Sequence, residues 1–83
     1  MELNVYTVYN RIDGSSDQLF LARTDARIAS DITNSINAQN EQYKAKNYPL
    51  VDFNNLEIRR IGIFDDTTSV ITPVPVSIVP FNT

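Results

Sequence analysis

The chain contains no cysteine and no histidine among its 83 residues. Disulfide bonds are therefore excluded, and so are metal sites built on thiolate or imidazole ligands. The same absence removes the usual partners that activate a serine or threonine nucleophile. With only two glycines, Gly14 and Gly62, the chain also lacks a glycine-rich phosphate-binding loop. We therefore expect a protein that is not an enzyme and that uses no cofactor.

Long hydrophobic runs are also missing. No stretch approaches the roughly 20 apolar residues that a membrane-spanning helix needs, and the opening MELNVYTVYN has neither the basic nor the apolar part of a signal peptide. We expect no membrane association and a location inside the cell. A chain this short buries only about 60 to 65% of its unfolded surface. Because disulfides and such metal sites are excluded, self-association is the expected source of extra stability.

Positive charge is in deficit. Lysine and arginine number 7 against 10 aspartates and glutamates, which gives a net charge of -3. Such a chain repels polyanions at long range, which argues against indiscriminate nucleic-acid binding but leaves room for a local basic patch. Hydrophobic residues make up 42% of the chain, a content typical of a globular protein and not of a disordered one.

The first third of the sequence predicts a hairpin. Residues 3–9 (LNVYTVY) alternate between two faces and are rich in β-branched and aromatic side chains, which favours a strand. Residues 10–17 collect Asn, Asp, Gly and Ser, which are typical of turns. Residues 18–23 (QLFLAR) then predict a second, short strand that pairs antiparallel with the first.

A helix is predicted next. Thr24 and Asp25 are each suitable N-caps, and apolar residues then recur at intervals of three and four. Pro49 disfavours helical backbone at the residue before it, so the helix ends earlier. We predict that residues 41–55 form a loop whose apolar side chains cover the core. The buried stripe of the helix is predicted to consist of Ile28, Ala29, Ile32 and Ile36.

The last third predicts a second hairpin. Residues 56–64 (LEIRRIGIF) form a strand, residues 65–69 (DDTTS) a turn, and residues 70–79 an extended partner that contains Pro73 and Pro75. Because proline cannot donate to a central ladder, this partner must run along an edge or leave the sheet. The paired acids at the start of the turn also fit a cation site. A turn explains them better, since no third spaced acid accompanies them.

The predicted fold class is α+β. One helix packs on one face of a four-stranded, mainly antiparallel β-β-α-β-β sheet, and this single domain spans residues 1–73. Residues 74–83 form an extended hydrophobic arm that either folds back over its own core or lies along a neighbouring subunit. We favour the second arrangement and a homo-oligomer. The candidate interface residues are Val74, Val76, Ile78 and Phe81.

Two adjacent arginines lie inside the strand of residues 56–64. Strict alternation puts Arg60 on the face of Gly62 and Phe64, and Arg59 on the opposite face beside Glu57. One interpretation is an amphipathic strand with solvated guanidinium groups. The other is a surface that binds single-stranded nucleic acid, with arginines on the backbone and tyrosines stacked on bases. Its candidate residues are Arg59, Arg60, Arg11, Arg23, Lys44, Lys46, Tyr6 and Tyr9.

Three segments together resemble a known family. LNVYTVYNR near the start, LFLARTDARIA at the beginning of the helix and IRRIGIFDDTTSVITP in the second hairpin are similar to the small nonstructural proteins of gokushovirus-like, single-stranded DNA phages of the microvirus group. The resemblance covers roughly residues 3–73. The matching positions are Val5, Tyr6, Tyr9, Asp25, Ile61, Gly62, Phe64, Asp65, Thr68, Ile71 and Pro73.

The resemblance implies a nonstructural protein of the host-cell cytoplasm that is not expected in the mature virion. It implies single-stranded DNA binding in genome replication or packaging, or else a homo-oligomeric module that contacts phage replication or assembly proteins without binding DNA. The sequence departs from the family at Ser69, where a glycine commonly follows the threonine. We expect Ser69 to change the turn type, because serine avoids positive φ.

Overall fold

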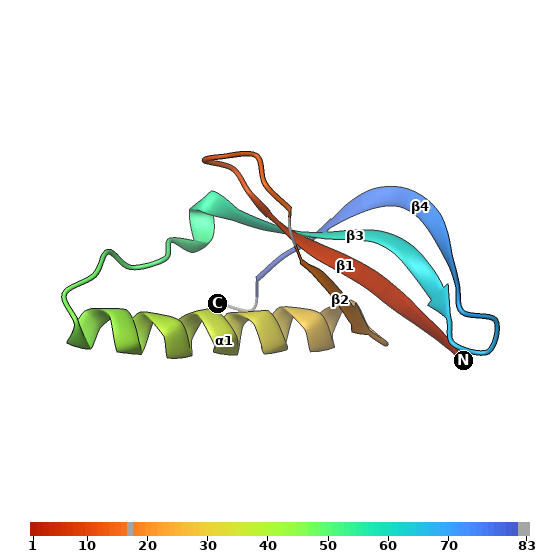
Figure 1. Ribbon diagram of the computed structural model, residues 1–83, viewed down its shortest axis with the longest axis horizontal. Coiled ribbons are helices and arrows are strands. Elements are labelled where there is room, and N and C mark those ends of the chain that lie inside the picture. The colour runs from red at the N-terminus through yellow and green to blue at the C-terminus, as the bar shows by residue number, and fades with distance from the viewer. Residues whose placement is uncertain (17, 82–83) are drawn as a thin grey trace.

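The computed structural model describes residues 1–16 and 18–81 and shows one helix packed on one antiparallel sheet (Figure 1). The four strands stand in the order β2-β1-β3-β4, so the long strands β1 and β3 are central. In the sequence, the helix lies between the two hairpins. The predicted α+β class is confirmed. The elements are β1 (Glu2–Asn10), β2 (Leu19–Ala22), α1 (Asp25–Ala45), the 3₁₀ turn η1 (Phe53–Asn55), β3 (Leu56–Asp65) and β4 (Val70–Val79).

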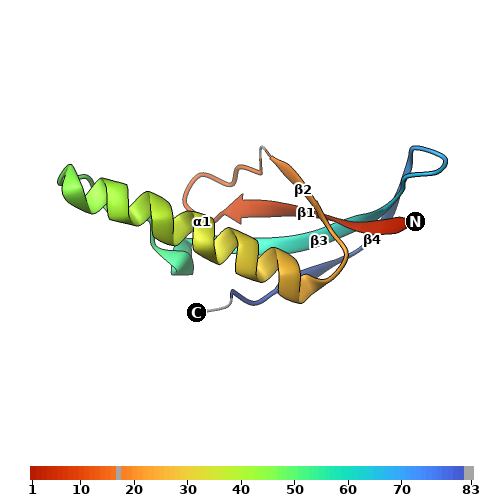
Figure 2. The ribbon, with the colours of Figure 1, turned by 90° about the horizontal axis from the view of Figure 1, so that it is seen from below.

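The helix α1 begins as predicted. Thr24 is its N-cap, and the Thr24 hydroxyl accepts a hydrogen bond of 3.2 Å from the Arg27 backbone N–H. The first half of α1 lies against the sheet, and its second half projects beyond the strands beside the loop that leads to β3 (Figures 1 and 2). One face of the sheet is therefore covered and the other is open.

The core lies between α1 and the covered face of the sheet. All four residues of the predicted stripe are buried, and they pack with Tyr6, Ile58 and Val79 from three strands. Removing one such apolar side chain from water contributes roughly 1.5 to 3 kcal/mol. Helix propensity is poor in this Ser- and Asn-rich segment, so the contacts with the sheet keep α1 folded.

The helix ends later than predicted. It continues to Ala45, so residues 41–45, predicted as loop, are helical because Glu, Gln, Lys and Ala favour a helix. Asn47 then adopts a positive φ of 58°, a conformation typical of the residue after a helix. In the remaining loop Val51 and Phe53 pack on the core as expected, but two other apolar residues are exposed: Tyr48 and Leu50.

A β-bulge in β3 changes which side chains share a face. Val5 pairs with Gly62 while the next residue of β1, Tyr6, pairs with Arg60, so Ile61 has no partner in this register. The predicted alternation is therefore wrong beyond Arg60, because an unpaired residue reverses the order of faces. Arg60 points to the covered face, and Gly62 lies on the open face. Phe64 lies there too, since its pairing partner is Leu3.

In the turn between β3 and β4, Ser69 has a backbone conformation that is typical of glycine. Ser69 has a φ of 59°, so the expectation that serine avoids positive φ is wrong. The Ser69 N–H donates to the Asp65 carbonyl oxygen at 2.8 Å, and the Thr67 N–H donates to Asp65 Oδ1 at 2.9 Å. These bonds fix the five-residue turn, whose left-handed residue costs roughly 1 to 2 kcal/mol.

The second half of β4 is the segment predicted as an arm. β4 runs as an edge strand through Pro73 and Pro75 to Val79, where it still pairs with β3 and enters the core. Phe81 then packs edge to face on Phe53, with 5.0 Å between the ring centroids. In this chain residues 74–81 therefore belong to its own sheet and core. Residues 82 and 83 of the predicted arm lie outside the described residues.

Candidate interaction surface on the open face of the sheet

Pairing register identifies the residues on the open face. In antiparallel strands, paired residues point to the same side of the sheet. Val5 pairs with Leu21 on one side and with Gly62 on the other, and Thr7 likewise pairs with Leu19 and Arg59. We call the apolar part of this surface the open apolar face. It consists of Leu3, Leu19, Leu21, Phe64, Ile71 and Ile78.

The open apolar face is exposed to a degree that single surface residues do not explain. Leu19 and Ile78 are each 63% exposed and Leu21 is 50% exposed. In contrast, Val5 in the central strand β1 is only 1% exposed. The helix does not cause this burial, because α1 covers the other face of the sheet (Figure 2). The flanking side chains of the sheet itself therefore close over β1. The exposed apolar side chains of this face therefore lie along the two edge strands, β2 and β4, and exposed apolar patches on a protein are typical of binding sites.

A cluster of polar side chains borders the open apolar face at the end of β1. The Arg59 guanidinium lies over the Tyr9 ring, 3.8 Å from its centroid, and Arg59 Nε donates to Glu57 Oε2 at 2.6 Å. Arg11 Nη2 donates to the other oxygen, Oε1, at 3.0 Å, and Arg11 Nη1 donates to the Asn54 carbonyl oxygen at 2.7 Å. We call these residues the Tyr9 cluster: Tyr9, Arg11, Glu57 and Arg59.

The charged groups of the Tyr9 cluster are paired with one another. Hydrogen bonds from Arg59 and then Arg11 lower the pKa of Glu57 below its ordinary value, so the carboxylate is charged at neutral pH. Two guanidinium groups and one carboxylate leave a net charge of +1. Arg11, with half of its side chain exposed, and the stacked Arg59 present the accessible cationic surface. Arg59 and Glu57, which alternation places on the same face, form an ion pair.

Arg60 belongs to a different network on the covered face. Arg60 Nη1 donates to both carboxylate oxygens of Asp25, at 3.2 and 3.0 Å. The Tyr6 hydroxyl donates to Asp25 Oδ1 at 2.6 Å and accepts from the Asn4 amide at 3.0 Å. This network fixes the start of α1 to β1 and β3, and the carboxylate also lies favourably at the positive end of the helix dipole.

Tyr6 cannot stack on a base as predicted. It is fully buried, and burial together with its hydrogen bond to Asp25 raises the pKa of Tyr6 to about 12. Its ring therefore has no face open to a ligand. The sequence did not identify this, because alternation groups Tyr6 with one face of β1 without telling which face the helix covers.

The remaining predicted cations lie apart from both networks. Arg23 lies between β2 and α1, whereas Lys44 and Lys46 lie at the far end of α1. All three are exposed, and among the described residues none of them has an acidic partner within 4.0 Å. Of the eight predicted nucleic-acid residues, the structure thus brings together three: Tyr9, Arg11 and Arg59.

The four predicted interface residues also divide. Ile78 is 63% exposed on the open face, and Val76 is 61% exposed in a part of β4 without a register partner. Val74 is half-buried and Phe81 packs on Phe53. Sequence reasoning missed the contribution of β2. The edge strand β2 consists of four consecutive apolar residues, Leu19–Ala22, so apolar side chains lie on both of its faces. Because a strand with one face in water needs apolar side chains on one face only, this run was a signal that both faces of β2 are covered.

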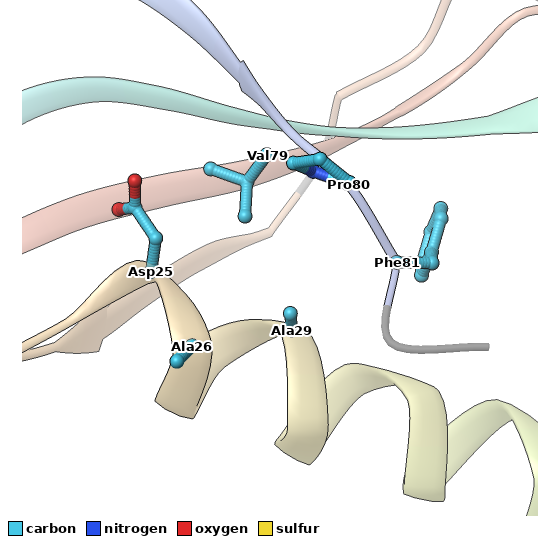
Figure 3. Close-up of a pocket in the computed structure, with 6 residues that line it drawn as sticks. All are labelled: Asp25, Ala26, Ala29, Val79, Pro80 and Phe81. Carbon is cyan, nitrogen blue, oxygen red and sulfur yellow. The ribbon is translucent and has the colours of Figure 1, made fainter.

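The hollows of the surface add no reactive group. One of about 320 Å³ lies between the start of α1 and the end of β4, where the small Ala26 and Ala29 face Val79, Pro80 and Phe81 (Figure 3). Its carboxylate, Asp25, is already bound by Tyr6 and Arg60. A larger hollow of about 550 Å³ lies between α1 and the far ends of β1 and β2, and no charged side chain lines it.

Other site types also lack support in the part of the chain that the structure describes. These residues contain no group of three or more acidic side chains placed to hold a metal ion. Among the same residues, α1 is too polar to cross a membrane. Comparison with protein-family models, with curated proteins and with solved structures found no match to this chain. The open face is therefore the feature from which a function can be argued.

Proposed function

We propose that this protein is a protein-protein interaction module whose binding surface is the open face of its sheet. The observation that carries the proposal is the open apolar face itself. Four of the ten exposed large apolar side chains among the described residues lie on it: Leu19, Leu21, Ile71 and Ile78. An exposed apolar surface lowers the solubility of a protein unless another protein covers it.

The composition of the face supports a protein partner over a nucleic acid. Apart from Phe64, its apolar side chains are aliphatic, and aliphatic side chains offer no ring on which a base can stack. Its border carries tyrosine and arginine, which are enriched at protein interfaces. The resemblance to gokushovirus-like nonstructural proteins supports a role in phage genome replication or assembly, inside the host cell and outside the mature virion.

The proposal is tested by co-expression with the proteins encoded beside its gene, followed by purification through a tag. We expect a complex that is lost in Leu21→Glu, because a charge buried in an apolar interface must be desolvated without a partner. Leu50→Glu is the matched control, since Leu50 is 56% exposed in the loop after α1. If complexes of the chain with itself or with a neighbouring gene's product survive both Leu21→Glu and Ile78→Glu, the open face is excluded as the binding surface.

A second candidate function, single-stranded DNA binding, is favoured by the Tyr9 cluster. The stacked Arg59 and Tyr9 form a flat surface, and Arg11 adds a second guanidinium beside it. Bases stack on aromatic rings and on guanidinium planes, and arginine also binds phosphate. The net charge of the chain requires that any such binding be local.

Fluorescence anisotropy of a labelled single strand of about 20 nucleotides tests this candidate at low and moderate salt. Binding should weaken with salt with a logarithmic slope of about -0.7 for each phosphate contacted. Arg59→Ala should abolish it. Arg27→Ala removes the same charge from the exposed side of α1 and should have no effect. Absence of binding at low salt, or equal loss in both variants, would exclude the Tyr9 cluster as a DNA site.

A further inference from the structure

We infer that this protein forms a dimer in which the edge strand β2 of one copy pairs antiparallel with β2 of a second copy. The two four-stranded sheets then join edge to edge into one continuous sheet. The contact runs along the edge of the sheet and leaves its open face free for another protein. The inference therefore goes beyond the proposed function.

The first argument is the contrast between the two edge strands. β4 contains Pro73 and Pro75, and its register with β3 shifts between Arg60 and Gly62. Prolines and bulges both hinder the pairing of a further strand. β2 contains neither a proline nor a charged residue, and it pairs with β1 in an unbroken register. Its outer backbone groups are therefore available to another strand.

The second argument is the apolar character of β2. A strand of four residues forms few backbone hydrogen bonds, so a stable pairing also needs contacts between side chains. Leu19 is 63% exposed and Leu21 is 50% exposed, and both lie on the open face at this edge. They can supply these contacts without the desolvation of any charge within β2.

The third argument is the symmetry of the segment Leu19-Phe20-Leu21 about its central residue. When two antiparallel copies are centred on Phe20, Leu19 of each copy lies directly opposite Leu21 of the other. These leucines share the open face, because paired residues point to the same side of a sheet. A pairing centred on Leu21 would instead place Leu19 opposite Arg23. A second copy centred on Phe20 therefore matches this edge in side-chain size and polarity.

The covered face beside β2 supports the same arrangement. Phe20 pairs with the buried Tyr6 and so lies on this face. It lines the hollow of about 550 Å³, together with Ile32 and Ile36 of α1 and without any charged side chain. The pairing places the second Phe20 next to the first. A further aromatic ring then adds apolar contact at this site.

Sedimentation velocity of the purified full chain over a concentration series tests the inference. We expect twice the chain mass. Leu19→Lys/Leu21→Lys places like charges opposite each other in both leucine pairs, so it should raise the dissociation constant more than tenfold. Leu19→Glu/Leu21→Lys places opposite charges there instead. It should dimerise at least about fourfold more tightly than the variant with two lysines.

The controls use exposed positions. Leu19 and Leu21 are at least half exposed within one chain, so circular dichroism of both double variants should stay that of a folded protein. Val76→Lys adds the same charge to the other edge strand, where Val76 is 61% exposed, and should leave the dimer unchanged. Equal dissociation of the two double variants, or of Val76→Lys and Leu19→Lys/Leu21→Lys, overturns the inference.

The outcomes separate this inference from the proposed function. A wild-type chain that stays at its single mass at every concentration overturns the inference. The proposed function then still holds if a neighbouring gene's product is lost from the complex in Ile78→Glu, because Ile78 lies on β4 at the opposite edge. A dimer that Ile78→Glu weakens and Leu19→Lys/Leu21→Lys does not also overturns the pairing through β2. That result supports the open face as the binding surface.

Discussion

The two adjacent arginines of β3 point to opposite faces of the sheet and have different contacts there. Arg60 points to the face that α1 covers, where Asp25 neutralises it within a network that includes the buried Tyr6. Arg59 points to the face without a helix, where its guanidinium lies on Tyr9 at the border of an apolar surface. A cation on the covered face serves the fold, whereas the same residue type one position earlier remains at a surface. The following predictions test whether this division holds.

The largest expected difference concerns two isoleucines on opposite faces. Ile58→Ala should lower the free energy of unfolding by about 2 to 5 kcal/mol, because Ile58 is fully buried under α1 and leaves a cavity. Ile78→Ala removes the same atoms from an exposed site and should cost less than about 0.5 kcal/mol. Urea denaturation in the Leu21→Glu background measures both without a contribution from association. Equal losses would mean that the open face is a core of the single chain.

A pH titration should report the network on the covered face. The pKa of Tyr6 is raised to about 12, above the ordinary value of 10.0, so the folded chain holds this proton more tightly than the unfolded chain. The associated stability is fully present below pH 10 and is lost as pH rises through 12, by roughly 2 to 3 kcal/mol. Urea denaturation should show this loss in the wild type.

Tyr6→Phe is the control for the titration. It should be less stable below pH 10, because two hydrogen bonds are lost, and it should lack this component of the alkaline decline. All other residues are the same in the two proteins, so their contributions cancel in the comparison. An identical decline in the two proteins would place Tyr6 outside the network.

The two arginines themselves allow a smaller test. Arg60→Ala should cost about 1 to 2 kcal/mol, because the Asp25 carboxylate loses its bonds to the guanidinium. Arg59→Ala should cost less than about 1 kcal/mol, since its ion pair and ring contact lie at a partly exposed border. Thermal unfolding ranks the pair. The reverse order would show that the Tyr9 cluster, and not the Asp25 network, stabilises the sheet.

The smallest expected effect lies in the turn that belongs to neither face. Ser69→Gly should stabilise the chain by about 0.5 to 1 kcal/mol, because glycine adopts positive φ without a steric cost. This corresponds to a rise in the unfolding temperature of roughly 2 to 8 °C. Gly14→Ala is the opposite control, since Gly14 has a φ of 71°. A destabilised Ser69→Gly would mean that the serine side chain contributes more than the strained backbone costs.

The existence and order of the secondary-structure elements were largely predictable from local patterns. Side chains of β1 alternate between two faces, the stripe from Ile28 to Ile36 marks the packed half of α1, and Thr24 marks the start of the helix. The orientation of side chains beyond Arg60 was not predictable. An alternation rule assumes a continuous ladder, and the bulge at Ile61 is visible only in the pairing of β3 with its neighbours.

The surface was predictable only in part for a related reason. Arg11, Arg59 and Tyr9 come from different strands and loops and meet through the register of β1 and β3. Sequence patterns identify residues with suitable chemistry, but they do not specify this register. The exposed leucines of β2 looked like ordinary strand residues, because a pattern of apolar residues does not show which face a single helix leaves open.

The prolines of β4 limit how large an assembly of this protein can become. Pro73 and Pro75 lie in an edge strand, where proline is tolerated with its missing N–H toward solvent. An edge without these donors is a poor template for a further strand, so growth of the sheet sideways into fibres is disfavoured. The prolines therefore protect the one long edge strand of this sheet from pairing with the strands of other chains.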